Sequence, residues 1–220
     1  MGPGGWRGMT TGIEPALDHL VYAAADLESA VAWFAEATGM SPVPGGRHLG
    51  QGTRNYLVGF GATSYLEIIG LDRDNPPDPG VPVPFGVDRL TQPRLVAWAV
   101  HPADIDAAVT ASRDAGADQG EIWPMSRRTP DGAVLRWRLA SGRPAPLAGV
   151  TPFLIDWGTT PHPASVTASR VSLTEFRVTH PDPATVRGVA AALGIALEVG
   201  AGSARLHAVL DTPRGPVTLS

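Results

Sequence analysis

Apolar residues along the chain recur in one pattern: a strand-like run, a short turn and an amphipathic helix that ends near a glycine. The runs are Leu17–Ala25, Leu95–Val100 and Leu173–Val178, and the helices that follow them are Leu27–Thr38, Asp104–Ala115 and Ala184–Leu193. An aspartate stands at each expected helix start, where its carboxylate can accept hydrogen bonds from free backbone N–H groups. Corresponding positions lie about 78 to 79 residues apart, and this near-constant period indicates an internal repeat.

Further strand-like runs follow each helix. They cover residues 41–49, 55–60 and 65–71, then 120–126, 134–140 and 151–157, and finally 197–199, 204–210 and 217–219. The pattern predicts an α+β protein with two tandem βαβββ modules and a third, shortened βαββ-like module at the C-terminus. The expected plan is a flexible tail (1–14), a first module (15–75), a linker (76–92), a second module (93–160) and the shortened module (170–220).

Composition narrows the classes of function. With 220 residues, 43% of them hydrophobic, the chain can bury a core, and a net charge of −4 gives no reason to expect nucleic acid or an anionic membrane. There is no cysteine, which excludes disulfides and thiolate chemistry and makes a reducing cytoplasm the expected location. All 17 basic residues are arginine, which excludes a Schiff-base lysine. A small molecule is the expected partner, and a homodimer is compatible with the sequence.

Motifs of other enzyme classes are missing. The chain has no serine-hydrolase elbow, no zinc-protease helix, no P-loop and no dinucleotide fingerprint. The glycine-rich stretch 45–52 leads into an expected strand rather than a helix, so it is not a phosphate cradle.

A tandem βαβββ unit with histidine on its first strand and glutamate on its last resembles the vicinal-oxygen-chelate superfamily. The two strands read Leu17-Asp18-His19-Leu20-Val21 and Tyr65-Leu66-Glu67-Ile68-Ile69. The segment from Gly45 to Asn55, with Gly-Gly-Arg-His at its start, resembles the glyoxalase-like branch more narrowly, as do the stretches 130–138 and 152–157. The resemblance implies paired modules whose sheets curl into a cup around a small molecule.

The resemblance also implies a divalent metal in the cup, such as Mn, Fe, Ni, Zn or Mg. His19 and Glu67 match two ligand positions of the first module, but the position matching His19 in the second module is Ala97. His48, if its loop folds into the cup, and Asp156 are the further candidate ligands. Two ligands from one module hold such an ion poorly.

His19 and Glu67 therefore have two functional readings, as metal ligands or as a metal-free acid–base pair in which the carboxylate orients the imidazole. The alternative without function is a core histidine bonded to backbone and a glutamate on the solvent face of its strand, because burial of an unpaired carboxylate is costly. His48, Thr53 and Asn55 are candidate substrate-binding residues, since their glycine-rich loop can approach a ligand. They can also bond locally within a turn.

Trp137 and Arg138 point to opposite faces of their expected strand. Trp137 facing inward supplies an apolar wall, which we favour; Arg138 facing inward clamps an anion, and it is kept as a candidate substrate-binding residue. Arg127 and Arg128 are expected to be exposed, the tryptophans at 98, 123 and 157 are expected to pack, and His162 carries no functional signal.

The favoured function is a glyoxalase-like small-molecule enzyme with lyase, isomerase or dioxygenase-type chemistry on an oxygenated metabolite, in which His19 and Glu67 are catalytic. The rival is a metal-free protein of the bleomycin-resistance type that binds and sequesters a small molecule. A third reading is a degenerate scaffold that serves in an assembly.

Overall fold

The computed structural model describes residues 17–167 and 169–220, so the predicted tail (1–14) lies outside the described residues. The first module comprises β1 (Leu17–Ala23), α1 (Leu27–Thr38), β2 (Val43–His48), β3 (Thr53–Gly59) and β4 (Tyr65–Leu71). The second comprises β5 (Arg94–Val100), α2 (Ile105–Asp114), β6 (Ile122–Arg128), β7 (Val134–Ala140) and β8 (Phe153–Asp156). The third comprises β9 (Ser172–His180), α3 (Pro183–Ala192), β10 (Glu198–Ala201), β11 (Arg205–Asp211) and β12 (Val217–Leu219). The predicted α+β class is confirmed.

The described part of the chain also contains three short 3-10 segments that the sequence did not indicate: η1 (Pro84–Arg89), η2 (Pro146–Gly149) and η3 (Pro163–Val166). The three α-helices begin where the aspartates predicted. The Asp26 carboxylate accepts a hydrogen bond from the Ser29 N–H, and Asp104 and Asp182 cap their helices in the same way. Helix α1 ends at Gly39, which has a left-handed φ of 73°. Glycine adopts this conformation without a steric cost.

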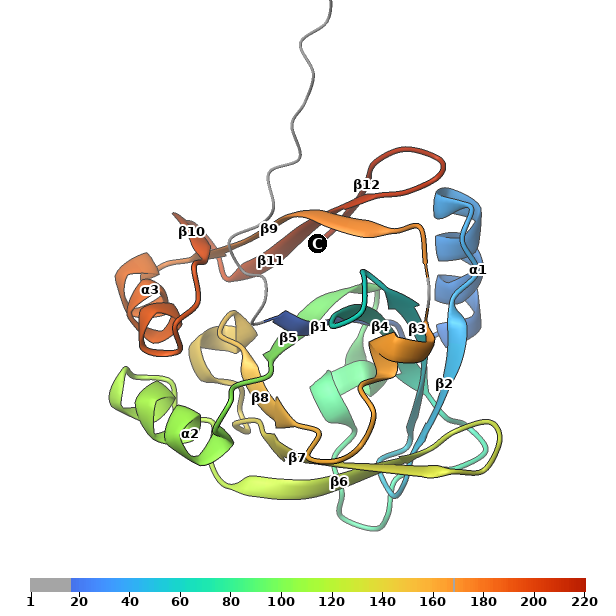
Figure 1. Ribbon diagram of the computed structural model, residues 1–220, viewed down its shortest axis with the longest axis horizontal. Coiled ribbons are helices and arrows are strands. Elements are labelled where there is room, and N and C mark those ends of the chain that lie inside the picture. The colour runs from blue at the N-terminus through green and yellow to red at the C-terminus, as the bar shows by residue number, and fades with distance from the viewer. Residues whose placement is uncertain (1–16, 168) are drawn as a thin grey trace, which may run out of the picture.

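The first two modules close into one eight-stranded barrel (Figure 1). Its strand order is β1-β4-β3-β2-β6-β7-β8-β5. In each module the first strand pairs in parallel with the last, and the modules join at the antiparallel pairs β1–β5 and β2–β6. Closure gives every barrel strand one face toward a common interior.

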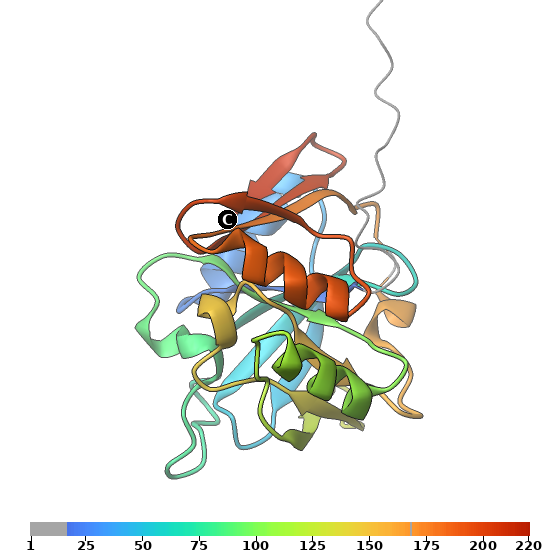
Figure 2. The ribbon, with the colours of Figure 1, turned by 90° about the vertical axis from the view of Figure 1, so that its left-hand side faces the viewer.

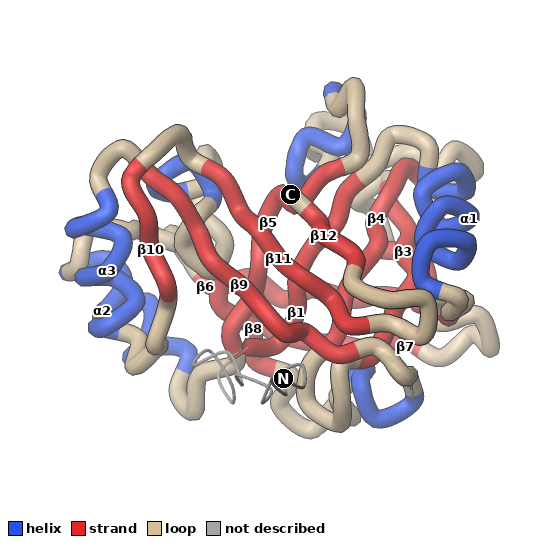
Figure 3. The backbone as a smooth tube through the Cα atoms, turned by 90° about the horizontal axis from the view of Figure 1, so that it is seen from above, coloured by secondary structure: helices blue, strands red, loops and turns tan. Residues whose placement is uncertain are grey.

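The third module forms a separate four-stranded sheet in the order β10-β9-β11-β12. All three strands expected after its helix are present, although β10 has four residues and β12 three. Its sheet order differs from that of the barrel modules, so the sequence repeat does not extend to the topology. Figure 3 shows this sheet lying across β1 and β5, and Figure 2 shows α3 beside α2.

Strand β1 is buried along its whole length, because it is covered on both faces. Val21 and Ala23 belong to the apolar cluster inside the barrel, whereas Leu20 and Tyr22 belong to the cluster that includes Phe176 and other residues of the C-terminal sheet. The C-terminal module thus supplies the outer cover of the strand that carries His19. This explains why β1 reads as a continuous apolar run rather than an alternating one.

None of the helices in the described part of the chain is both long enough and apolar enough to cross a bilayer.

Candidate functional site

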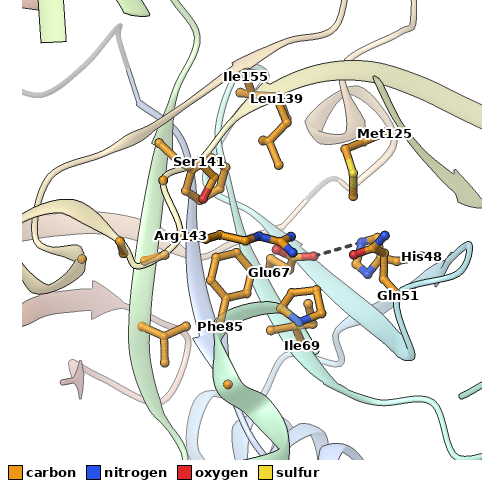
Figure 4. Close-up of a pocket in the computed structure, with 18 of the residues that line it drawn as sticks. His48, Gln51, Glu67, Ile69, Phe85, Met125, Leu139, Ser141, Arg143 and Ile155 are labelled. Atoms are coloured by element: carbon orange, nitrogen blue, oxygen red, sulfur yellow. Dashed lines mark ion pairs between the residues drawn. The ribbon is translucent and has the colours of Figure 1, made fainter. Parts of the chain in front are cut away.

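The barrel encloses a cavity of about 450 Å³, seen in close-up in Figure 4. Polar side chains gather on the wall formed by the first module and by β6: His19, His48, Asn55, Glu67 and Arg127. The facing wall is apolar and comes mainly from the second module: Ala97, Met125, Trp137, Leu139, Phe153 and Ile155. The cavity therefore combines one polar end with a large apolar surface, the usual composition of a small-molecule site.

His19 and Glu67 face this same cavity. Strands β1 and β4 run in parallel with His19 opposite Tyr65 and Val21 opposite Glu67. Side chains alternate along a strand, so His19 and Glu67 share the inward face. The distance from His19 Nε2 to Glu67 Oε2 is 3.8 Å, and the Glu67 side chain is only 8% exposed.

Glu67 is held by neighbours from β2 and β3. The Asn55 amide donates a hydrogen bond of 2.5 Å to Glu67 Oε1, and His48 Nε2 lies 3.5 Å from the same oxygen (Figure 4). Thr53 Oγ1 lies 3.0 Å from His48 Nδ1. Thr53 itself does not line the cavity, so it positions His48 rather than facing a ligand.

Asp18 is the fully buried anchor of the site, which sequence reasoning did not single out. A register shift in the β1–β5 pairing falls between Leu17 and His19. Such an irregularity can turn a side chain out of the regular alternation. Asp18 Oδ1 accepts a 2.6 Å hydrogen bond from His19 Nδ1, and Asp18 Oδ2 accepts one of 2.9 Å from the Trp157 indole.

His162 also bonds to Asp18, although its sequence context gave no signal. His162 Nδ1 accepts a hydrogen bond from the Ala164 N–H, so His162 Nε2 carries a proton and donates to Asp18 Oδ2 at 3.1 Å. Burial alone raises the pKa of Asp18, but the hydrogen bonds from His162 and His19 more than offset it and hold that pKa well below its usual range. The ionised Asp18 keeps the Nδ1 proton on His19 and leaves Nε2 facing Glu67.

Arg127 is buried at 4% exposure, which corrects the prediction that it is exposed. The reason is barrel closure: β6 pairs with β2 so that Arg127 lies opposite His48, and both point inward. Its guanidinium donates a 3.3 Å hydrogen bond to Asn55 Oδ1. Burial lowers the pKa of Arg127 from its ordinary value of 12.5, while Tyr65 and Glu67 act against this shift.

Two of the rings around the carboxylate, His48 and Tyr65, have pKa values shifted toward their neutral forms. Burial lowers the pKa of His48, and the negative charge of Glu67 only partly opposes it. Burial, together with the charges of Asp18 and Glu67, raises the pKa of Tyr65 well above its ordinary value. Tyr65 stacks on His19 with ring centroids 4.7 Å apart, so it restrains the imidazole from the side.

Two further predicted site residues lie outside the cavity. Arg138 and Asp156 are paired across β7 and β8, and both point away from the barrel interior. The Arg138 guanidinium bonds to Asp156 Oδ2 at 2.7 Å and to Asp106 at 3.2 Å. Alternation explains the result, because Trp137 and Ile155 take the inward positions of these strands. Trp123, expected to pack, is 56% exposed, whereas Trp157 lines the cavity.

Replacing Arg138 by alanine tests its outward position. We expect the free energy of unfolding to change little, because an exposed ion pair contributes little to stability. Phenylpyruvate serves here as an aromatic carbonyl probe of the cavity, and its affinity, followed by the fluorescence of the lining residues Trp137 and Trp157, should be the same in variant and wild type. A severalfold loss of affinity would place Arg138 against the ligand and contradict its position here.

A divalent metal does not fit the described residues. No group of three His, Cys, Asp or Glu side chains at ligand spacing occurs within residues 17–167 and 169–220. The second module contributes Ala97, Phe153 and Ile155 where further ligands would be needed. The Asn55 amide also donates to the Glu67 oxygen nearest His48. The chemistry of this site therefore rests on its own side chains.

A barrel closed by two βαβββ modules, with histidine on the first strand and glutamate on the last, defines a protein of the vicinal-oxygen-chelate superfamily. Within that class the chain belongs to the glyoxalase-like domain family, whose model matches residues 17–194. No protein of curated function matches the sequence.

Solved structures with the same fold share little sequence with this chain. A hypothetical protein from Staphylococcus aureus superposes with a TM-score of 0.60 at 17% identity, over 92% of this chain and 83% of its own. A variant of 4-hydroxymandelate synthase from Streptomyces coelicolor gives 0.52 at 17% identity, over 93% of this chain and 62% of its own. Methylmalonyl-CoA epimerase from Mycobacterium tuberculosis gives 0.40 at 19% identity, over 67% and 89%. The first two likenesses establish the fold alone.

Proposed function

We propose that this protein is a small-molecule enzyme that transfers a proton at a carbon next to a carbonyl group of an oxygenated metabolite bound in the barrel. The observation that carries the proposal is the buried chain of groups Asp18–His19–Glu67, whose far end faces the cavity. Isomerisation and lyase reactions of carbonyl compounds share this proton transfer as their first step. The residues favour that step without choosing between the reactions.

Glu67 acts as the general base in this proposal. Its carboxylate takes the proton from the substrate carbon, and the electron pair of the broken C–H bond moves onto the carbonyl oxygen to give an enolate. The Arg127 guanidinium stabilises the developing negative charge, because a buried cation interacts strongly with charge in a water-poor site. The proton then returns to the substrate from Glu67, or through His19.

His19 acts with Glu67, and Asp18 is a positioning residue. Asp18 fixes the His19 ring by its Nδ1 bond, which leaves Nε2 3.8 Å from Glu67 Oε2. In this orientation Nε2 can accept or return a proton at the carboxylate. Asn55 and His48 hold the other carboxylate oxygen and orient it.

The second candidate is a binding protein that sequesters a small molecule without turnover. It is favoured by the apolar wall of Ala97, Trp137, Phe153 and Ile155, which offers contact area without reactive groups. Both candidates use the same cavity, so binding of a ligand there does not distinguish the enzyme from the binding protein. Chemical turnover of the ligand does distinguish them.

Hydrogen exchange with solvent separates enzyme from binder without knowledge of the product. The protein is incubated in deuterium oxide with phenylpyruvate, 2-oxobutyrate or the neutral ketone phenylacetone, and loss of the C–H signal is followed by proton NMR. We expect exchange above the buffer rate with at least one of these compounds. Binding of all three with no exchange would reject the enzyme and support the binder. Arg205→Gln, which changes an exposed position on β11, serves as the control variant and should exchange at the wild-type rate.

Removal of metal is expected to leave exchange unchanged. The described residues lack a third ligand at metal spacing, so dialysis against a chelator should alter neither the exchange rate nor the thermal midpoint. Loss of exchange on chelation, with recovery on adding Mn²⁺ or Zn²⁺, would contradict this expectation. Elemental analysis of chelator-free protein provides the independent check.

A further inference from the structure

Arginines dominate the charge of the cavity lining. Arg89, Arg94, Arg127 and Arg143 line it, and the single acidic residue among the lining residues is Glu67. The chain as a whole carries a net charge of −4. The cavity is therefore a local concentration of positive charge in an acidic protein, and such a field attracts anions.

Three of these arginines stand at the mouth, apart from the buried Arg127. Arg89 ends η1, Arg94 begins β5 and Arg143 precedes η2, and all three residues are exposed. Figure 4 shows the Arg143 side chain extended into the cavity. The Arg89 guanidinium lies against Gly86, another lining residue, where an added Cβ would approach it to 2.8 Å.

The mouth arginines are little used by internal ion pairs. Arg89 has only a 3.8 Å contact with its neighbour Asp88, and neither Arg94 nor Arg143 lies within 4.0 Å of a carboxylate in the described part of the chain. Some other arginines do pair with carboxylates, as Arg113 does with Asp118 at 3.1 Å and Arg177 with Glu175 at 2.9 Å. The charges at the mouth are thus available to a ligand.

The backbone of the two segments at the mouth is strained. Within residues 17–167 and 169–220, the non-glycine residues with positive φ are Phe85, Leu147 and Ala148, at 56°, 47° and 55°. All three lie in η1 and η2, the segments that flank the cavity beside Arg89 and Arg143. Residues in this conformation cost free energy and cluster at ligand sites. Their confinement to these two segments supports a role of the mouth in binding.

We propose that the substrate is an organic anion with an apolar body, whose carboxylate, sulfonate or phosphate group is bound at the mouth by Arg89, Arg94 and Arg143. The body lies along the wall of Trp137 and Phe153, and the reacting carbonyl reaches Arg127 and Glu67 at the polar end. The anionic group binds at the mouth because the Glu67 carboxylate repels it from the inner end. The inference rests on the proposed function for the position of the reacting carbon, but not for the binding of the anion.

Two dyes of the same shape test the anion site directly. Anilinonaphthalene sulfonate and phenylnaphthylamine share their aromatic body, and only the first carries a sulfonate. Titrations followed by dye fluorescence give the ratio of the two dissociation constants. We expect the anion to bind at least about tenfold more tightly at low salt, with a smaller ratio at high salt. Equal affinity for the two dyes would overturn the proposal.

Variants locate the preference. Arg94→Gln and Arg143→Gln are each expected to weaken the sulfonate by about three- to fivefold, and the double variant by more, with the neutral dye unchanged. Arg205→Gln is the matched control, because it removes an arginine that is also exposed but lies outside the cavity lining. An unchanged ratio in the double variant, or an equal loss in the control, would show that the dye binds elsewhere. Both substitutions are at exposed sites, so neither is expected to disturb the folding of the core.

Failure of the anion site and failure of the enzyme give different results. Dye binding does not require Glu67, so Glu67→Gln should retain the preference for the anion. A preference for the sulfonate without solvent exchange on any carbonyl compound leaves this inference standing and rejects the enzyme. Exchange that is as fast with phenylacetone as with phenylpyruvate, together with equal dye affinities, rejects the anion site and leaves the enzyme.

Discussion

Replacing Glu67 by glutamine is expected to lower the rate of solvent exchange into a bound carbonyl substrate by about 100- to 10,000-fold, the usual contribution of a positioned general base. Glutamine keeps the shape of the side chain and an oxygen that can accept the Asn55 amide hydrogen bond. It cannot take a proton at neutral pH. The loss should therefore appear in the rate, while the affinity for the anionic dye is retained.

Two comparisons make this result specific to the chemistry. Thermal midpoints of wild type and Glu67→Gln should agree within a few degrees, which excludes unfolding as the cause. Asp106→Asn, which changes an exposed carboxylate on α2, should exchange as fast as wild type. A Glu67→Gln variant with more than about a tenth of the wild-type rate would show that another group removes the proton.

Replacing Asp18 by asparagine is expected to lower the free energy of unfolding by about 3 kcal/mol, because buried hydrogen bonds to a charged group are strong and a donor left unpaired there is costly. Asp18 accepts from His19, Trp157 and His162, all of which are donors. The asparagine amide nitrogen would face at least one of them. Urea denaturation of the variant, with Asp106→Asn as the exposed control, measures the difference.

The same substitution has a defined pH dependence. The pKa of Asp18 is lower in the folded protein than in the unfolded chain. The contribution of Asp18 to the free energy of unfolding is therefore present above the unfolded pKa of about 3.9 and is lost as pH falls toward the folded pKa. The stability difference between wild type and Asp18→Asn should therefore narrow below about pH 4. A difference that widens on acidification would contradict the ionised, hydrogen-bonded state of Asp18.

The sequence predicts the local structure of this protein well. Strand and helix periods, the aspartate caps and the terminal glycines are encoded by neighbouring residues, and helix α1 and strands β4 and β7 occur with the predicted bounds. The inward positions of His19 and Glu67 also follow locally, because the parallel β1–β4 pairing belongs to one βαβββ unit.

The site residues that the sequence did not reveal owe their positions to contacts between distant parts of the chain. Arg127 is buried because β6 closes the barrel against β2, and His162 bonds to Asp18 across 144 positions of sequence. Neither contact has a local signature. Arg138 was ambiguous for a different reason: the alternation along β7 was evident, but the direction of Trp137 decides which face is inside.

The stereochemistry of hydrogen exchange tests the central claim most directly. A base fixed on one wall of a cavity reaches only one of the two hydrogens on a CH₂ group next to a carbonyl. In deuterium oxide, wild-type protein should therefore place a single deuterium, in one configuration, at that carbon of phenylpyruvate or 2-oxobutyrate, and Glu67→Gln should place none above the buffer rate. Random loss of both hydrogens at equal rates in wild type and variant would contradict a positioned base at Glu67.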